Sequence, residues 1–384
     1  MKIIKTAVIG SGFMGSTHIE ALKRIGGVEV TAIVSKEKDQ AQILAERYSI
    51  PQVFENWEDV FKENDIEVIH NCTPNIFHYE INKAAIKNNK HIISEKPLTI
   101  SAQQSSELLE LLRKHNVVNA VNFNYRFYPL IRHLHSVFEK EIGNVFLVHG
   151  HYLQDWLFYD TDYNWRLETG ISGESRAIAD IGSHWCDLIQ FVTGLKISKV
   201  FADLSTIHQV RKKPAVSSET FKGKEESKSS ETSDEKISTE DAGSVLFALE
   251  NGAKGVFTVS QVSAGRKNHF WFEIDGNKKA VAWNQENPNE LWIGHREKAN
   301  EILIKDPALL SAEGRKFAHY PGGHPEGYPD GPKNLFMSVY DFIREGKNPL
   351  KDKPDFPTFM DGHQENKIVE AILKSNKEQK WVEL

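Results

Sequence analysis

The chain has 384 residues, of which 40% are hydrophobic and 26% charged, and its formal net charge is -6 at pH 7. This length exceeds one typical core, so two domains are expected. The negative charge argues against a nucleic-acid partner, and no run of about 18 apolar residues is present to span a membrane. The chain has two cysteines, Cys72 and Cys186, and no secretory h-region near its start. We therefore expect a cytoplasmic protein.

Strand and helix patterns alternate over the first third of the chain. Predicted strands cover 6–10, 28–34, 66–71, 91–94 and 117–122, and predicted helices cover 13–24, 36–48, 76–89 and 101–115. Nearly continuous apolar strands separated by helices are typical of a doubly wound parallel sheet of the Rossmann type, and hence of an α/β fold. We place this dinucleotide-binding domain at residues 1–123.

The pattern changes after residue 123. Predicted helices cover 130–140, 183–193, 334–345 and 358–375, and predicted strands cover 145–153, 200–207, 242–249, 253–262, 269–275, 280–283 and 290–293. Consecutive strands with hairpin signals such as Glu250-Asn251-Gly252 predict a mainly antiparallel sheet in an α+β domain, 124–384. Its C-terminal helices are expected to pack either there or on the first domain. Residues 211–240, rich in Ser, Lys and Glu, are expected to form a mobile insertion.

A glycine loop, Gly10-Ser11-Gly12-Phe13-Met14-Gly15, joins the first predicted strand to the first predicted helix. Gly10 permits a tight turn, Gly12 lets the backbone approach a pyrophosphate, and Gly15 allows the helix to pack closely. The free N–H groups of the helix face the anion. Because strand, loop and helix occur in this order, the loop, with Phe13 and Met14, is predicted to bind NAD or NADP.

The second predicted strand ends without the acidic residue that commonly binds the ribose of NAD. Ser35 and Lys36 stand there, with Glu37 next. A hydroxyl and an ammonium accept a 2′-phosphate, which a carboxylate repels. The pattern favours NADP, and NAD bound through Glu37 stays open as the alternative.

Three polar residues have the chemistry to oxidise an alcohol. Lys96 follows the fourth predicted strand, at the sheet edge where ligands bind, and suits the stabilisation of alkoxide charge. Asp180 and His184 are four residues apart at a predicted helix start, and an imidazole is a suitable general base near neutral pH. Asp187 is a candidate to orient that ring. A zinc site of His184, Cys186 and Asp187 is not favoured, because these positions do not converge on one ion; no metal is predicted.

Together these motifs resemble the Gfo/Idh/MocA family, which includes glucose-fructose oxidoreductase and inositol dehydrogenase. The resemblance runs through residues 10–15, 73–78, 95–97, 122–126 and 180–187. It implies that Lys96, Asp180 and His184 line the reacting carbinol. It also implies an open antiparallel sheet used to form a dimer or tetramer. The further cofactor contacts that it implies are those of Thr73, Pro74, Asn75, His78, Glu95, Lys96 and Asn124.

A narrower resemblance is to the levoglucosan dehydrogenase-like branch, carried by residues 152–156 and 164–166. In that branch these segments stand near the sugar. The loop 320–328 resembles another loop of sugar-oxidising members, from which His324 or Glu326 would reach the substrate. The expected substrate contacts are Tyr125, Arg126, Gln154, Asp155, Trp156, Trp165, Arg166 and His324. Core packing of either tryptophan stays open as the alternative.

The sequence therefore predicts an enzyme, an oxidoreductase that transfers a hydride between NAD(P) and a ring hydroxyl of a pyranose sugar, anhydrosugar or cyclitol. Two alternatives remain. One is a glycoside hydrolase that retains NAD and oxidises the sugar transiently. The other is a non-catalytic sugar or dinucleotide sensor, which would have no need of the acid-base residues.

Overall fold

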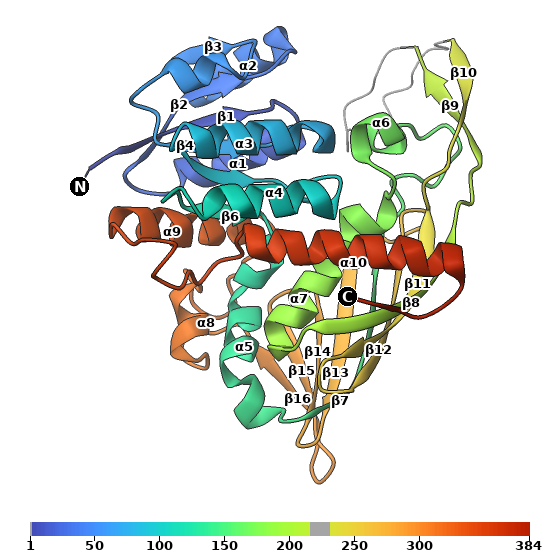
Figure 1. Ribbon diagram of the computed structural model, residues 1–384. Helices are drawn as coiled ribbons and strands as arrows, with labels where there is room; N and C mark the ends of the chain where they lie inside the picture. Colours follow the sequence, from blue (N-terminus) through green and yellow to red (C-terminus); the bar gives the residue numbers. More distant parts are fainter. Residues whose placement is uncertain (1, 216–230) are drawn as a thin grey trace.

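Two large sheets organise the chain in the computed structural model, which describes residues 2–215 and 231–384 (Figure 1). One sheet has six parallel strands and the other has nine mainly antiparallel strands. The predicted α/β fold class, a Rossmann domain followed by an α+β domain, is confirmed. The two sheets have separate hydrophobic cores.

The parallel sheet has the strand order β3-β2-β1-β4-β5-β6. Its strands are β1 (Ile4–Ile9), β2 (Val28–Val34), β3 (Gln52–Phe54), β4 (Val68–Asn71), β5 (His91–Ser94) and β6 (Asn119–Val121). Its helices are α1 (Phe13–Lys23), α2 (Lys38–Tyr48), α3 (His78–Lys87) and α4 (Ala102–Leu112). The order reverses between β1 and β4, and ligands of such sheets bind at that point, beyond the carboxyl ends of the strands.

The large sheet has the order β16-β15-β14-β13-β7-β12-β11-β8-β17. Its strands are β7 (Val145–Leu153), β8 (Ile197–Ser205), β11 (Ala242–Leu249), β12 (Lys254–Ser260), β13 (His269–Gly276), β14 (Ala280–Asn284), β15 (Glu290–Gly294), β16 (Glu301–Ile304) and β17 (Val382–Glu383). Two helices, α5 (Pro129–Glu141) and α7 (Ser183–Thr193), pack on one face and share its core. Alternate residues of each strand therefore face this core, and the others face away from it.

The last two long helices connect the domains. After the short helix α8 (Ala312–Lys316), α9 (Asp330–Arg344) packs on α1. Helix α10 (Phe359–Glu378) begins with a capping box at Thr358 and runs across both domains, contacting α4 and β8 (Figure 1). A Cβ at Gly362 would lie 2.8 Å from Cβ of Leu98, so only glycine lets α10 approach the first domain this closely.

The insertion predicted at 211–240 includes residues that form regular strands. Both of its ends are ordered, because β9 (Val210–Pro214) pairs with β10 (Thr232–Lys236) as an antiparallel hairpin. Arg211 is fully buried and pairs with Asp241. The prediction went wrong because polar contacts, rather than apolar residues, hold this hairpin. The middle of the predicted insertion, 216–230, lies outside the described residues.

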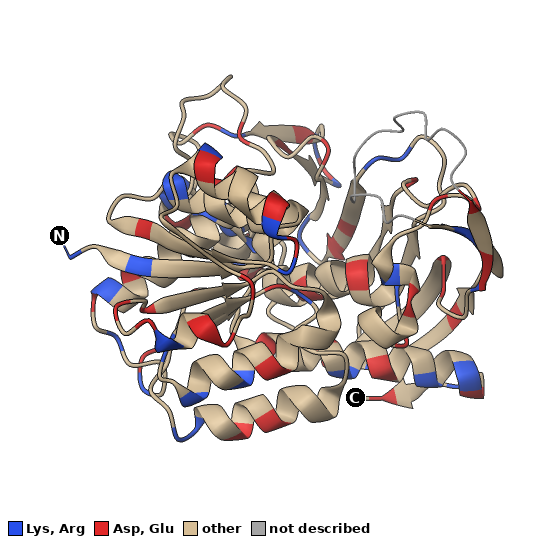
Figure 2. Cartoon of the chain, turned by 90° about the horizontal axis from the view of Figure 1, so that it is seen from above, with Lys and Arg blue, Asp and Glu red and all other residues tan. Residues whose placement is uncertain are grey.

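On the face of the chain seen in Figure 2, acidic and basic residues are mixed along the surface helices. Among residues 2–215 and 231–384, no helix combines the length and the apolar composition needed to cross a membrane.

Candidate active site

The glycine loop lies between β1 and α1 and has the shape of a phosphate cradle. Gly10 has a φ of +113°, a conformation that other residues rarely adopt, and a Cβ at Gly15 would lie 2.0 Å from the carbonyl oxygen of Gly10. A Cβ at Gly12 would meet no protein atom within 4 Å. Because Gly12 is also the N-cap of α1, no side chain caps the first amides of that helix. The loop therefore fits a dinucleotide pyrophosphate.

The end of β2 lies beside this loop. Ser11 Oγ donates to Ser35 Oγ at 2.7 Å, and the backbone N of Glu37 donates to the same oxygen at 3.1 Å. The ammonium of Lys36 lies 5.6 Å from the centre of the Phe77 ring. A hydroxyl and a cation thus stand at the edge where the ribose of a dinucleotide binds.

His78 joins two loops at the carboxyl edge of the parallel sheet. Its Nδ1 lies 2.6 Å from the carbonyl oxygen of Pro97, and its Nε2 lies 2.8 Å from that of Thr73. Pro74 and Asn75 follow, and Asn75 Nδ2 donates to the carbonyl oxygen of Ser172 in the second domain at 2.9 Å. The predicted cofactor loop therefore lies between the two domains.

Lys96 and Asp180 meet across the domain boundary. Lys96 Nζ donates to the carboxylate of Asp180 at 2.7 Å and to its carbonyl oxygen at 2.8 Å. Arg166 Nε lies 3.4 Å from the same carboxylate, and Gln261 Nε2 donates to it at 2.9 Å. Burial alone would raise the pKa of Asp180, but Lys96 and then Arg166 outweigh burial and hold it well below its usual value. Asp180 is therefore ionised.

His184 lies in the first turn of α7, one turn beyond Asp180. Asp180 belongs to a π-helical turn, Ile178–Gly182, that precedes α7. The ring of His184 packs edge-on against Tyr125, with ring centres 4.9 Å apart. Burial, followed by the charge of Lys96, lowers the pKa of His184 to about 3. The imidazole is therefore neutral at pH 7, and it is a weaker base than a solvent-exposed imidazole.

Asp187 does not orient His184. It accepts from Arg126 Nε at 2.8 Å, and the same guanidinium donates to Asp361 of α10 at 2.9 Å. Within the described residues, Nδ1 of His184 has no hydrogen-bond partner. The prediction that Asp187 orients the imidazole is therefore wrong. Arg126, predicted to bind substrate, forms buried ion pairs with Asp187 and Asp361.

The segment after β7 carries the next predicted substrate residues. Gln154 Nε2 donates to Asn268 Oδ1 at 2.8 Å, and Gln154 Oε1 accepts from Trp156 Nε1 at 2.8 Å. Asp155 accepts from Lys267 Nζ at 2.7 Å. Trp156 also packs against a small cluster around Leu157, so part of its surface is used in the core.

Two polar residues that the sequence analysis missed bond to predicted site residues. Asn268 Nδ2 donates to the hydroxyl of Tyr125 at 3.0 Å, and Gln261 donates to Asp180 as described above. Asn268 and Gln261 belong to no motif, so no local pattern marked them.

The two predicted substrate residues Trp165 and Arg166 lie against each other. The ring of Trp165 lies under the guanidinium of Arg166, whose central carbon is 4.4 Å from the ring centre.

The loop 320–328 covers the start of α1, but through a different residue from those predicted. His324 is exposed, and Glu326 is buried in an ion pair with Lys305 Nζ at 2.7 Å. Glu326 is therefore not free to bind substrate. Tyr328 stacks on Phe13 of the cofactor loop, with ring centres 6.4 Å apart. The sequence predicted that this loop lies at the site, but it did not single out Tyr328 as the residue that contacts the cofactor loop.

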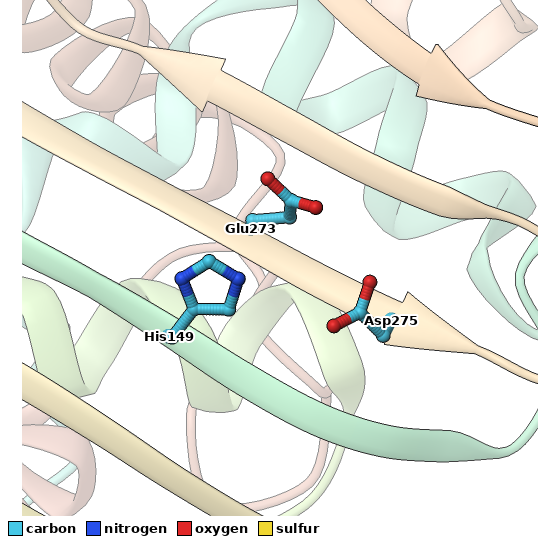
Figure 3. A group of neighbouring side chains, drawn as sticks. All are labelled: His149, Glu273 and Asp275. Atoms are coloured by element: carbon cyan, nitrogen blue, oxygen red, sulfur yellow. The ribbon is translucent and has the colours of Figure 1, made fainter. Parts of the chain in front are cut away.

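One group of potential metal ligands lies on strands β7 and β13. Figure 3 shows His149, Glu273 and Asp275, whose ligand atoms lie within 4.8 Å of one another. All three are partly exposed, on the side of the sheet that faces away from α7. This group is separate from Lys96 and His184.

Two family descriptions match the chain. Residues 4–123 match the oxidoreductase family with an NAD-binding Rossmann fold, and residues 132–282 match the GFO/IDH/MocA C-terminal domain. The first match covers the glycine loop and Lys96, and the second covers Asp180 and His184.

Relatives with assigned names match nearly all of the chain. Levoglucosan dehydrogenase of Pseudarthrobacter phenanthrenivorans is 28% identical over 100% of this chain and 99% of its own length. A structure of levoglucosan dehydrogenase with NADH and L-sorbose has a TM-score of 0.88 at 26% identity and covers 100% of this chain and 99% of its own. Glucose-6-phosphate 3-dehydrogenase of Bacillus subtilis is 21% identical over 97% of this chain and 96% of its own length. The chain is a member of the Gfo/Idh/MocA family of NAD-binding oxidoreductases.

Proposed function

We propose that this protein oxidises one ring hydroxyl of an uncharged pyranose, anhydrosugar or cyclitol, with NAD or NADP as the hydride acceptor. The observation that carries this proposal is the contact between Lys96 Nζ and the Asp180 carboxylate at 2.7 Å, beside a neutral buried imidazole. A sensor has no use for such an acid-base set. The structure of levoglucosan dehydrogenase with NADH and levoglucosan supports the sugar class, at 26% identity and a TM-score of 0.86 over 100% of this chain and 99% of its own.

The residues have distinct roles in this reaction. The bound nicotinamide supplies the hydride acceptor. His184, neutral at pH 7, takes the proton of the reacting hydroxyl. The Lys96 ammonium stabilises the negative charge that develops on the alkoxide oxygen. Asp180 holds Lys96 in place through two hydrogen bonds.

The ion pairs around the site favour an uncharged substrate. Arg166 faces Asp180, and Arg126 is held by two carboxylates. A phosphate on the substrate would have to displace one of these carboxylates, because a buried anion needs a cation of its own. This distinguishes the proposed substrate from the sugar phosphate in the name of the Bacillus subtilis relative.

A panel of sugars tests the proposal. We expect reduced-nicotinamide absorbance to rise with at least one neutral pyranose, anhydrosugar or inositol, and kcat/KM to be about 10-fold or more lower for a 6-phosphate of the same sugar. Steady-state rates with NAD and NADP measure this. Cleavage of an aryl glycoside without net cofactor reduction would favour the hydrolase instead. Cofactor binding without any turnover would favour the sensor.

Lys36 is proposed to support binding of NADP. Lys36→Asp should lower kcat/KM for NADP by about 10-fold and change that for NAD much less, because a carboxylate repels the 2′-phosphate. The matched control is Lys38→Asp, since Lys38 pairs with Glu55 on the surface. Equal changes in kcat/KM with NAD and with NADP would mean that Lys36 does not set the preference between the two cofactors.

The outer face of the large sheet is proposed to join copies of this chain. It exposes apolar side chains on β7, β11 and β16, with exposed fractions from 41% to 59%: Leu147, Leu246, Ile302 and Ile304. A second copy packed on this face would remove these side chains from water.

A further inference from the structure

A row of buried polar side chains crosses the core of the first domain and ends beside Lys96. The hydroxyl of Tyr340 on α9 lies 3.0 Å from Nε2 of His70 on β4. Nδ1 of His70 lies 2.9 Å from Nδ1 of His18 on α1, and Nε2 of His18 lies 2.9 Å from Glu95 Oε1. All four side chains are buried. A donor or acceptor left unpaired here would be costly, so the directions of these bonds are constrained.

Burial limits the protons that two of these groups carry. Burial, and then the nearby His18, hold the pKa of His70 well below its usual value, so its ring carries one proton. Burial raises the pKa of Tyr340 well above its usual value, so its hydroxyl keeps its proton. Because two Nδ1 atoms face each other, only one of them carries a proton.

Nε2 of His18 is the atom that meets the carboxylate. It lies 2.9 Å from Glu95 Oε1, to which it donates, and Asn122 Nδ2 lies 3.2 Å from the same nitrogen. One of the two facing Nδ1 atoms donates to the other, and Nε2 of His70 bonds to the Tyr340 hydroxyl. The row of hydrogen bonds therefore ends on the Glu95 carboxylate whichever Nδ1 carries the proton.

Glu95 connects this row of hydrogen bonds to Lys96. Burial alone would raise the pKa of Glu95, but His18, Lys96 and Asn122 outweigh burial and lower it to about 2, so Glu95 is a carboxylate. Its Oε1 also accepts from Asn122 Nδ2 at 2.6 Å, and its Oε2 accepts from the backbone N of Lys96 at 3.2 Å. The carboxylate therefore holds the peptide from which the Lys96 side chain reaches Asp180.

We propose that His18, His70 and Tyr340 are positioning residues, which hold the Glu95 carboxylate through a row of buried hydrogen bonds and thereby place Lys96 at the reacting carbinol. The proposal rests on the proposed function for the role of Lys96. Without the Nε2 donor, the buried carboxylate turns or takes up a proton, and the Lys96 peptide loses its fixed acceptor. A displacement of about 1 Å at a reacting group lowers the rate by up to roughly 100-fold.

Two substitutions of His18 separate positioning from packing. His18→Leu should lower kcat by about 10-fold or more, with NADH affinity by fluorescence changed less than about threefold. His18→Gln keeps one donor and one acceptor and should recover most of that loss. The matched control is His363→Leu on α10, which removes a histidine bonded to Ser105 at 2.8 Å and should keep wild-type kcat. A folded His18→Leu variant with wild-type kcat, or a Gln variant as slow as the Leu variant, would overturn the proposal.

Nitrogen-15 NMR of histidine-labelled wild-type protein tests the contact with Glu95 without any substrate. We expect Nε2 of His18 to carry a proton at pH 7, with Tyr340→Phe used to assign the His70 signals. A His18 without a proton at Nε2 cannot donate to Glu95 and overturns the proposal. If no sugar is turned over by the wild-type enzyme, the proposed function fails, while the NMR result still decides whether His18 donates to Glu95.

Discussion

Lys96→Ala is expected to lower kcat by about 100-fold or more, because it removes the cation that stabilises the alkoxide. NADH affinity should change less than about threefold, since the Lys96 ammonium is bonded to Asp180 and not to the glycine loop. Steady-state rates with the best substrate of the panel and NADH fluorescence titration measure the two quantities.

The matched control for Lys96→Ala is Lys213→Ala. Lys213 pairs with Glu168 on the surface, so its loss removes a lysine of similar charge outside the proposed chemistry. Its kcat should stay at the wild-type value. A Lys96→Ala variant with unchanged kcat would mean that another group stabilises the alkoxide.

Asp241→Ala is expected to lower the free energy of unfolding by about 3–5 kcal/mol, because a buried ion pair that loses one partner leaves an uncompensated charge. Here two guanidiniums are affected, since Arg176 and Arg211 both donate to the Asp241 carboxylate and both are fully buried. The same carboxylate also accepts from the backbone N of Ile207 and His208. Urea unfolding followed by circular dichroism measures the change.

Asp234→Ala on the neighbouring strand β10 is the control for Asp241→Ala. Asp234 pairs with Lys212, and the two side chains are 64% and 43% exposed. Exposed pairs contribute about 0–1 kcal/mol, so this substitution should leave the unfolding midpoint nearly unchanged. Similar losses in the two variants would show that the hairpin as a whole, and not the buried carboxylate, sets the stability.

The sequence predicted well those strands whose apolar pattern alone shows which residues are buried. Val28–Val34, His91–Ser94 and Val145–Leu153 form strands with the predicted bounds, because apolar or alternating patterns report burial directly. Gln52–Phe54 and Glu301–Ile304 were missed as strands. The first has only three residues, and the second has no residue fully buried, so neither has a clear burial pattern.

The candidate site was predictable where a local motif carried it. The sequence pointed to Lys96 and Asp180 through short patterns, and the structure brings them into contact. The sequence did not reveal the ion pairs of Arg126 with Asp187 and Asp361, because their residues come from distant segments: Asp361 of α10 is 235 residues from Arg126. Tyr328 and Gln261 likewise gain their positions only from tertiary packing.

Helix α10 supplies residues to the cores of both domains. Its first residue, Phe359, belongs to the core of the parallel sheet, whereas Ile368 and Ile372 belong to the core of the large sheet. Neither core is therefore complete without the last 26 residues of the chain. The two domains should melt together in a single cooperative transition, and a fragment that ends before α10 should lose its tertiary structure along with its activity.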